Sequence, residues 1–193
     1  MPQRECQVME EKNTDVLLKQ IAAGDNDAFR LFYDRYYLQV YRFASYFVDS
    51  SLLIEEIVSD VFCIIWQRRE KLSQIDSFER YLYTITKNKA FYYLRNESKL
   101  TLTELDPLSA RFADEEDPEY LVVDKELTVS LKEAVDDLPE RCRLIFMMAR
   151  EEGLKYKEIA EILSISEKTV NAQMVLAIKK LTKRLGDIVL FIL

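Results

Sequence analysis

Apolar residues recur along this chain at intervals of three and four, the spacing that places side chains on one face of an α-helix. One such stripe consists of Ile54, Val58, Val61, Ile65 and Leu72. The pattern predicts helices over residues 14–42 (with a turn at Gly24-Asp25), 41–48, 54–72, 78–99, 127–136, 139–153, 156–163 and 167–185. A short loop is predicted between Leu72 and Ser77. The sequence therefore predicts an all-α protein.

The helical pattern stops between residues 100 and 126, and this interval divides the chain. It contains Pro107, Pro118 and the acidic run 114–117. We interpret it as a flexible acidic linker between two small helical domains, residues 12–99 and 127–186. Residues 187–193 form an apolar tail that we expect to pack on the second domain, the alternative being that it is a surface for a partner. With three glycines and four prolines in 193 residues, the chain lacks the turn residues of a β-sandwich or barrel.

Composition removes several classes of function. Histidine is absent, which excludes His-based zinc sites and Ser-His-Asp or Cys-His catalysis. Cys6, Cys63 and Cys142 are far apart and form no CxxC pair, so they predict a reducing cytoplasm rather than a zinc ribbon. No apolar run reaches the ~18–20 residues of a membrane span, and the polar amino terminus does not resemble a signal peptide. We expect no metal, no cofactor and no enzymatic activity.

The net charge of −7 is unevenly distributed along the chain. Residues 68–99 and 141–193 each carry a net charge of +4, whereas residues 1–67 carry −5 and residues 100–140 carry −10. Two basic zones separated by an acidic connector indicate two contacts with a polyanion. The alternative is that these charges form ordinary solvated surface.

The last predicted helix has two dissimilar faces. Its expected core face consists of Val170, Met174, Ile178, Leu181 and Leu185. The opposite face consists of Lys168, Ala172, Leu176, Lys179 and Lys183. A short helix, a turn at 164–166 with Ser166 as helix cap, and a longer helix with small and basic outer residues are typical of a helix-turn-helix, whose second helix enters the DNA major groove. A helical hairpin with a lysine-rich solvated face fits the same pattern equally well.

The helix predicted over 78–99 is asymmetric in a similar way. Leu82, Ile85 and Tyr93 share one face, and Arg80, Thr84, Lys87, Asn88, Phe91 and Arg95 share the other. Cations, an amide and an aromatic ring suit a separated nucleic-acid strand, because cations bind phosphates, the amide bonds a base edge and the ring stacks. The alternative is that the aromatic residues are core, which we prefer for Tyr83, Tyr92 and Tyr93.

Three motifs follow one another along the chain. They are IEEIVSDVFCIIW at 54–66, FERYLYTITKNKAFYYLR at 78–95, and LPERCR at 138–143 with GLKYKEIA at 153–160 and SEKTV at 166–170. Together they resemble the bacterial extracytoplasmic-function (ECF) sigma factors, the promoter-specificity subunits of RNA polymerase, and the last motif is most similar to Bacteroidetes-type members. The resemblance covers residues 12–186 and implies a region 2 domain, a linker and a region 4 helix-turn-helix.

The resemblance also implies partners and site residues. Core RNA polymerase would be bound by Glu56, Asp60 and Gln67. The −10 promoter element would be bound by Ser73, Gln74, Asp76, Phe78, Arg80, Thr84, Lys87, Asn88, Phe91 and Arg95. The −35 element would be bound by Ser166, Lys168, Thr169, Asn171, Ala172, Val175, Leu176, Lys179 and Lys183. An anti-sigma factor, often anchored in the membrane in this family, is expected to hold the protein inactive, and exposed Val175 and Leu176 would suit it.

The chain departs from the family pattern at several positions. Ser164 stands where a glycine is frequent in the helix-turn-helix turn, and Tyr81 stands where a tryptophan is frequent. Asn171 and Leu176 replace common arginines, which predicts weaker and more apolar groove contacts. Two other functions fit the pattern: a stand-alone helix-turn-helix repressor and a helical adaptor that binds only protein. The acidic 54–66 helix followed by the 78–95 helix favours the sigma factor, because a simple repressor does not need this pair.

Overall fold

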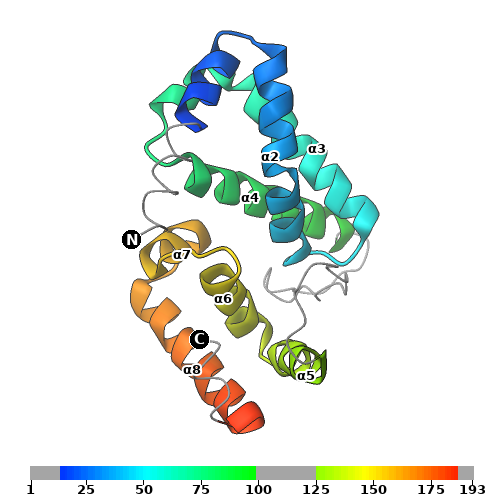
Figure 1. Ribbon diagram of the computed structural model, residues 1–193, viewed down its shortest axis with the longest axis vertical. Helices are drawn as coiled ribbons and strands as arrows, with labels where there is room; N and C mark the ends of the chain where they lie inside the picture. Colours follow the sequence, from blue (N-terminus) through cyan, green and yellow to red (C-terminus); the bar gives the residue numbers. More distant parts are fainter. Residues whose placement is uncertain (1–13, 99–124, 187–193) are drawn as a thin grey trace. The chain divides into compact units, whose positions relative to one another are not determined.

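The computed structural model describes residues 14–98 and 125–186, and within these ranges it contains helices and turns but no strand. The described residues form two compact units. One includes the residues up to Ser45 and from Ser50 to Tyr93, and the other includes the four carboxy-terminal helices (Figure 1). The predicted all-α fold with two domains is therefore confirmed. The apolar tail 187–193 and residues 100–124 of the predicted linker lie outside the described residues.

Helices α2 (Asn26–Ser45) and α3 (Ser51–Gln67) pack against each other in the first unit (Figure 1). A helix over residues 14–22 precedes α2, and Gly24, with a φ of 86°, allows the chain to turn between them. Ser50 caps α3, because its side chain accepts a hydrogen bond from the backbone N–H of Leu53. The whole apolar stripe predicted for α3 and the following turn is buried.

Aromatic rings fill the interior of this unit, and α4 (Phe78–Ser98) packs against them. The ring of Phe32 lies 5.8 Å from that of Phe62 and 5.3 Å from that of Phe78, both edge to face. The ring of Tyr83 lies 4.6 Å from that of Phe43 in the same geometry. Such pairs add about 0.5–1.5 kcal/mol each beyond the burial of their area. The first half of α4 is thus held on α2 by buried rings.

The second unit contains α5 (Lys125–Asp136), α6 (Glu140–Arg150), α7 (Tyr156–Leu163) and α8 (Glu167–Leu185). Helix α8 packs against the other three (Figure 1). Its inner face consists of Val170, Met174, Ala177 and Leu181, which are all buried. The bounds of α7 and α8 agree with the sequence prediction residue for residue.

The structure corrects four details of the sequence prediction. The stretch 41–48 is not a separate helix, because α2 continues to Ser45. The helix predicted over 54–72 ends at Gln67, and a 3₁₀-helix, η1 (Arg69–Gln74), forms its last part and the first part of the predicted loop, with Leu72 buried. Tyr92 was expected in the core but is 51% exposed. In α8, Ile178 and Leu185 were expected in the core but are half-buried, whereas Ala177, which was not expected there, is buried.

Candidate nucleic-acid interface

The segment from α7 to α8 has the geometry of a helix-turn-helix. Helix α7 ends at Leu163, and the next residue, Ser164, lies in the left-handed region with φ 56° and ψ 44°. The chain turns back there, since the N–H of Ile165 bonds the carbonyl of Ala160 at 2.9 Å. Ser166 then starts α8 by accepting a hydrogen bond from the N–H of Thr169 at 3.0 Å. The predicted cap is confirmed, and a serine occupies the conformation that glycine adopts most easily.

The outer face of α8 presents most of the side chains predicted to contact DNA. The preceding cap residue Ser166 is exposed, as are six of those on α8: Lys168, Asn171, Ala172, Val175, Lys179 and Lys183. Thr169 is half-buried, and its hydroxyl lies 2.8 Å from that of Ser166. Leu176 was expected to be exposed but is half-buried, because it lies at the edge of the inner face beside buried Ala177. The face therefore offers lysines and short side chains, as a helix inserted in a major groove requires.

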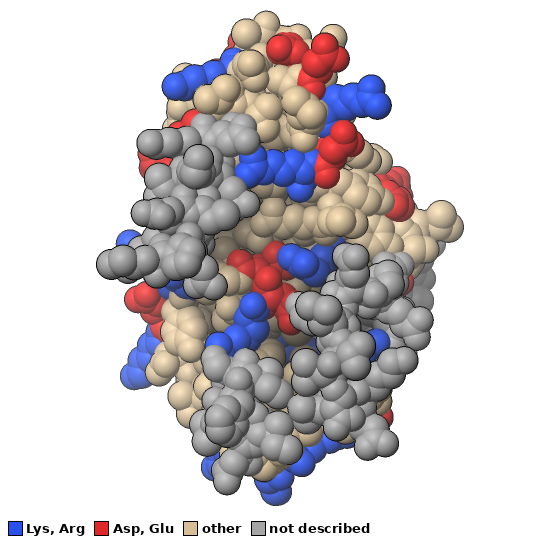
Figure 2. Space-filling view, viewed as in Figure 1, with Lys and Arg blue, Asp and Glu red and all other residues tan. Residues whose placement is uncertain are grey.

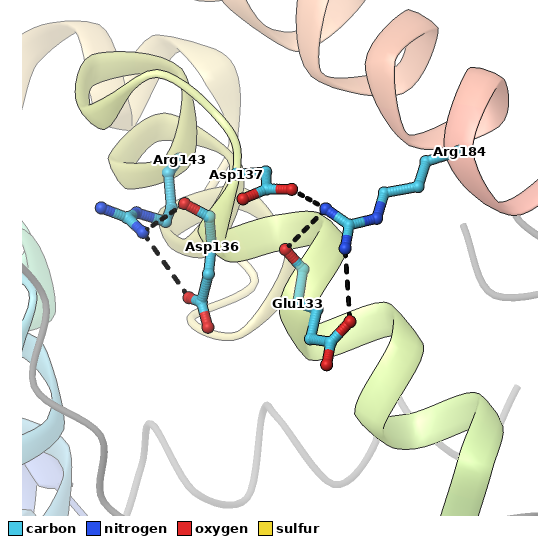
Figure 3. Close-up of polar contacts among 5 residues, drawn as sticks. All are labelled: Glu133, Asp136, Asp137, Arg143 and Arg184. Carbon is cyan, nitrogen blue, oxygen red and sulfur yellow. Dashed lines mark hydrogen bonds and ion pairs between the residues drawn. The ribbon is translucent and has the colours of Figure 1, made fainter.

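Two arginines form ion pairs and hydrogen bonds at the carboxy-terminal end of α5, and neither contact was predicted from the sequence. Arg184, in the last turn of α8, forms ion pairs with Glu133 and Asp137 and donates to the Glu133 carbonyl at 3.3 Å. Arg143 of α6 donates to the Asp136 carbonyl at 2.7 Å and lies 3.6 Å from its carboxylate. Figure 3 shows both guanidinium groups directed at this end of α5. Arg184 is exposed like Lys179 and Lys183, but it is paired with acidic residues of its own unit.

The sequence indicates only one side of the contacts between these arginines and the end of α5. Three acidic residues close α5, where the negative end of the helix dipole favours cations. Their partners come from two other helices, one of them about fifty residues away along the chain, and no periodicity within one helix can identify such partners.

Fewer side chains are exposed on the outer face of α4 than the sequence predicts. Asn88 and Arg95 are exposed, and Arg80, Thr84 and Phe91 are half-buried. The Thr84 hydroxyl donates a hydrogen bond to the carbonyl of Arg80 at 2.8 Å, so its hydrogen is used within the helix.

Two residues predicted to bind the −10 element lie in the interior. Phe78 is only 8% exposed, because its ring fills the space against Phe32 and Tyr36. Lys87 is also 8% exposed, and its ammonium lies 5.9 Å from the centre of the Phe91 ring. Burial lowers the pKa of Lys87, since it disfavours the charged form.

The turn before α4 places three predicted residues in solvent. Ser73 and Gln74 at the end of η1 and Asp76 after it are all exposed. Leu72 anchors this turn in the core, and the Ser77 hydroxyl accepts a hydrogen bond from the N–H of Arg80 at 3.4 Å. The turn thus presents hydroxyl, amide and carboxylate groups from a fixed base next to α4.

The three residues predicted to bind polymerase lie on α3, and they differ in their surroundings. Glu56 and Gln67 are exposed, and the Gln67 amide donates to the thiol of Cys63 at 3.3 Å. Asp60 is half-exposed and bonds Lys89 at 2.8 Å and the hydroxyl of Tyr93 at 3.0 Å. Asp60 therefore differs from the other two, because α4 supplies it with two partners, and its contact with polymerase stays a prediction.

The surface of the described residues is mixed in charge. In the view of Figure 2, basic and acidic side chains are interspersed on the visible face. Within the two described ranges, no helix combines the length and apolar character needed to cross a membrane. In the same ranges, no three Cys, Asp or Glu side chains are grouped so that they could hold a metal ion.

Comparison with known proteins agrees with this division of the chain. Residues 32–100 match the Sigma-70 region 2 family and residues 128–181 match the Sigma-70 region 4 family. The chain is similar to the ECF RNA polymerase sigma-E factor of Escherichia coli (strain K12), with 27% identity over 175 residues that cover 86% of this chain and 91% of the relative. It is also 27% identical, over 180 residues, to the ECF RNA polymerase sigma factor SigK of Mycolicibacterium vanbaalenii, covering 89% of each chain.

A solved structure supports the fold. The structure of CnrH in complex with the cytosolic domain of CnrY covers 88% of this chain and 94% of CnrH, with a TM-score of 0.58 and 20% identity. The two family matches together span more than half of the chain. The chain therefore belongs to the sigma-70 family, and its relatives place it among the ECF sigma factors.

Proposed function

We propose that this protein is an alternative sigma factor that binds core RNA polymerase and directs it to promoters with two recognition elements. One observation carries the proposal: a helix-turn-helix with an exposed lysine-bearing face and a separate helix with an exposed asparagine stand in two units of one chain. A repressor that reads duplex DNA needs only the first of these. The protein would act in the cytoplasm, where polymerase and chromosome meet, as an initiation factor without enzymatic activity.

Each unit has a proposed role. In the second unit, α8 would enter the major groove of the −35 element, with Lys179 and Lys183 on phosphates and Asn171 and Ala172 near base edges. In the first unit, the turn at 73–76 and the face of α4 around Asn88 would hold an unstacked base of the −10 element. The exposed Glu56 and Gln67 of α3 would contact the polymerase.

We also propose that the protein is held inactive by an anti-sigma factor. CnrH, whose fold this chain shares, is solved in complex with the cytosolic domain of CnrY. Here Val175 is 58% exposed on the proposed DNA-binding face of α8, and a partner that covered it would block the −35 contact. The sequence of the motif at 153–170 supports membership of a Bacteroidetes-type group of ECF sigma factors.

The substitution Asn88→Ala tests the role of α4. A carboxamide offers both donors and an acceptor to the edge of an unstacked base, and alanine offers neither. Since Asn88 is an exposed mid-helix residue, alanine should leave the fold and the binding of core polymerase intact. We expect slower open-complex formation on duplex promoters and a changed base preference at one −10 position.

A pre-melted bubble promoter is the control for this experiment. It should restore part of the activity, because the cost of unpairing has already been met. If the variant opens duplex promoters at the wild-type rate with the same preference, Asn88 does not read the base. If the wild-type chain binds a palindromic operator as a dimer without polymerase, the repressor function is correct instead.

A further inference from the structure

The two halves of α4 are attached to the rest of the first unit by different chemistry. In the first half, the Phe78 ring lies 5.3 Å from Phe32 and 5.7 Å from Tyr36, and Tyr83 packs on Phe43. These are buried aromatic contacts with α2. The second half, which carries Asn88, buries Ala90 and also makes a polar contact with α3.

A single carboxylate oxygen of α3 holds two successive turns of α4. Oδ2 of Asp60 accepts from Nζ of Lys89 at 2.8 Å and from the hydroxyl of Tyr93 at 3.0 Å. The side chains of Lys89 and Asp60 are 28% and 37% exposed, so the ion pair lies at the edge of the core and not in open solvent. We call Asp60, Lys89 and Tyr93 the Asp60 cluster.

The hydroxyl of Tyr93 is suited to donating a hydrogen bond to Asp60 at all physiological pH values. Burial, the hydrogen bond to Asp60 and the negative charges of Asp60 and Glu56 all raise the pKa of Tyr93. The hydroxyl therefore keeps its proton throughout the physiological range and always has a hydrogen to give to Asp60.

The Asp60 cluster lies beside the proposed base-reading face and leaves it open. At 3.6 residues per turn, Lys89 lies about 100° and Tyr93 about 140° around the α4 axis from Asn88. Bonds at these two positions add to the buried rings of the first half in setting how far α4 is rotated about its own axis. They consequently contribute to setting the direction in which the exposed Asn88 side chain points.

We propose that Asp60 is a positioning residue that couples the polymerase-binding helix α3 to the base-reading half of α4 through Lys89 and Tyr93. The inference rests on the proposed function. Holding a binding group in the correct direction contributes to a reaction even when the holding contact is weak, because small misplacements are costly in rate. In this account the loss of the Asp60 cluster slows promoter opening more than it weakens the binding of polymerase.

A different account makes different predictions for the same residues. If Asp60 contacts polymerase directly, its loss weakens core binding and Lys89 is irrelevant to that effect. If Lys89 contacts a DNA phosphate directly, its loss flattens the salt dependence of DNA binding, and an acidic residue at that position makes binding worse. Exchanging the two charges separates these accounts from ours.

The experiment uses the full chain with core RNA polymerase of the same organism. The variants are Asp60→Asn, Lys89→Met and the double exchange Asp60→Lys with Lys89→Asp. Lys19→Met, which removes an exposed lysine of the 14–22 helix, is the matched control. Core affinity is measured by titration, and opening rates are measured with saturating holoenzyme on duplex and pre-melted promoters.

We expect Asp60→Asn and Lys89→Met to slow duplex opening by about threefold to fivefold each, the size of a partly exposed ion pair. The double exchange should recover part of the loss, because the ion pair is restored with reversed charge, whereas a lysine at position 60 cannot accept the hydrogen bond of the Tyr93 hydroxyl. Pre-melted promoters should show a smaller loss, and Lys19→Met should show none.

Three results would overturn the inference. The first is a Lys89→Met variant that opens duplex promoters at the wild-type rate. The second is a double exchange that is slower than either single variant, which would point to direct contacts by Asp60 and Lys89. The third is a wild-type chain that does not bind core polymerase, which would overturn the proposed function as well and is recognised from the wild-type titration alone.

Discussion

The turn of the helix-turn-helix contains a residue that the backbone does not favour. Ser164 has a φ of 56° and is the one non-glycine residue with positive φ among the described residues. In the left-handed region the Cβ of an L-residue crowds its own backbone, which costs about 1–2 kcal/mol. The side chain of Ser164 is exposed, so glycine at this position would remove the crowding and leave the buried core unchanged.

The expected gain from Ser164→Gly is the difference between two opposing effects. Glycine relieves the left-handed conformation, but it also gives the unfolded chain more freedom, which costs up to about 1 kcal/mol. We expect a net stabilisation of about 0.5–1 kcal/mol. For a unit of this size it raises Tm by roughly 2–8 °C. The backbone bonds of the turn, including Ile165 N–H to Ala160 at 2.9 Å, should persist.

Thermal unfolding followed by two probes tests this prediction. Far-UV circular dichroism reports on both helical units, whereas the fluorescence of Trp66, the single tryptophan of the chain, reports on the first unit. Ser130→Gly is the matched control, because it places the same substitution at an exposed position inside helix α5. We expect this control to lose about 0.5 kcal/mol. An unchanged or lower Tm for Ser164→Gly would refute the argument that Ser164 is strained.

The remaining predictions concern charge and thiols. Lys179→Ala and Lys183→Ala should each flatten the slope of log DNA affinity against log salt by about 0.9. Arg184→Ala should leave this slope unchanged and lower Tm, because Arg184 is already paired within the unit. Equal slopes for the wild type and the three variants would contradict this contrast. In a variant that lacks Cys6, exposed Cys63 should be alkylated quickly and buried Cys142 only on unfolding. Similar alkylation rates for the two thiols would contradict the structure. Because burial raises the pKa of Cys142 above its ordinary value of 9.0, the folded protein binds this proton more tightly than the unfolded chain, so stability should fall as pH rises above about 9.

Local signals allowed the carboxy-terminal unit to be predicted closely. Helix α8 begins and ends at the predicted residues because a serine cap precedes it and Gly186 follows it. The turn at Ser164 was the doubtful point, and the structure places that residue in the glycine-like conformation. Capping and helical periodicity depend on neighbours within a few residues, so the sequence reveals them directly.

Contacts between distant residues could not be predicted in the same way. Phe78 follows the predicted loop and was assigned to the DNA-binding face, yet it lies among rings from α2. Asp60 has the position of an outward acid on α3, but residues twenty-nine and thirty-three positions later bind it. Helical spacing gives the direction of a side chain around its own helix, and only the packing of helices decides what lies there.

Transcription in a purified system tests the central claim most directly. Core RNA polymerase of the same organism is combined with this chain and with genomic DNA fragments, and the transcripts are mapped. The account predicts discrete start sites, preceded by two shared sequence elements, that appear only when both the chain and the core enzyme are present. Absence of chain-dependent transcripts, or sequence-selective DNA binding by the chain alone that merely blocks transcription, would contradict it.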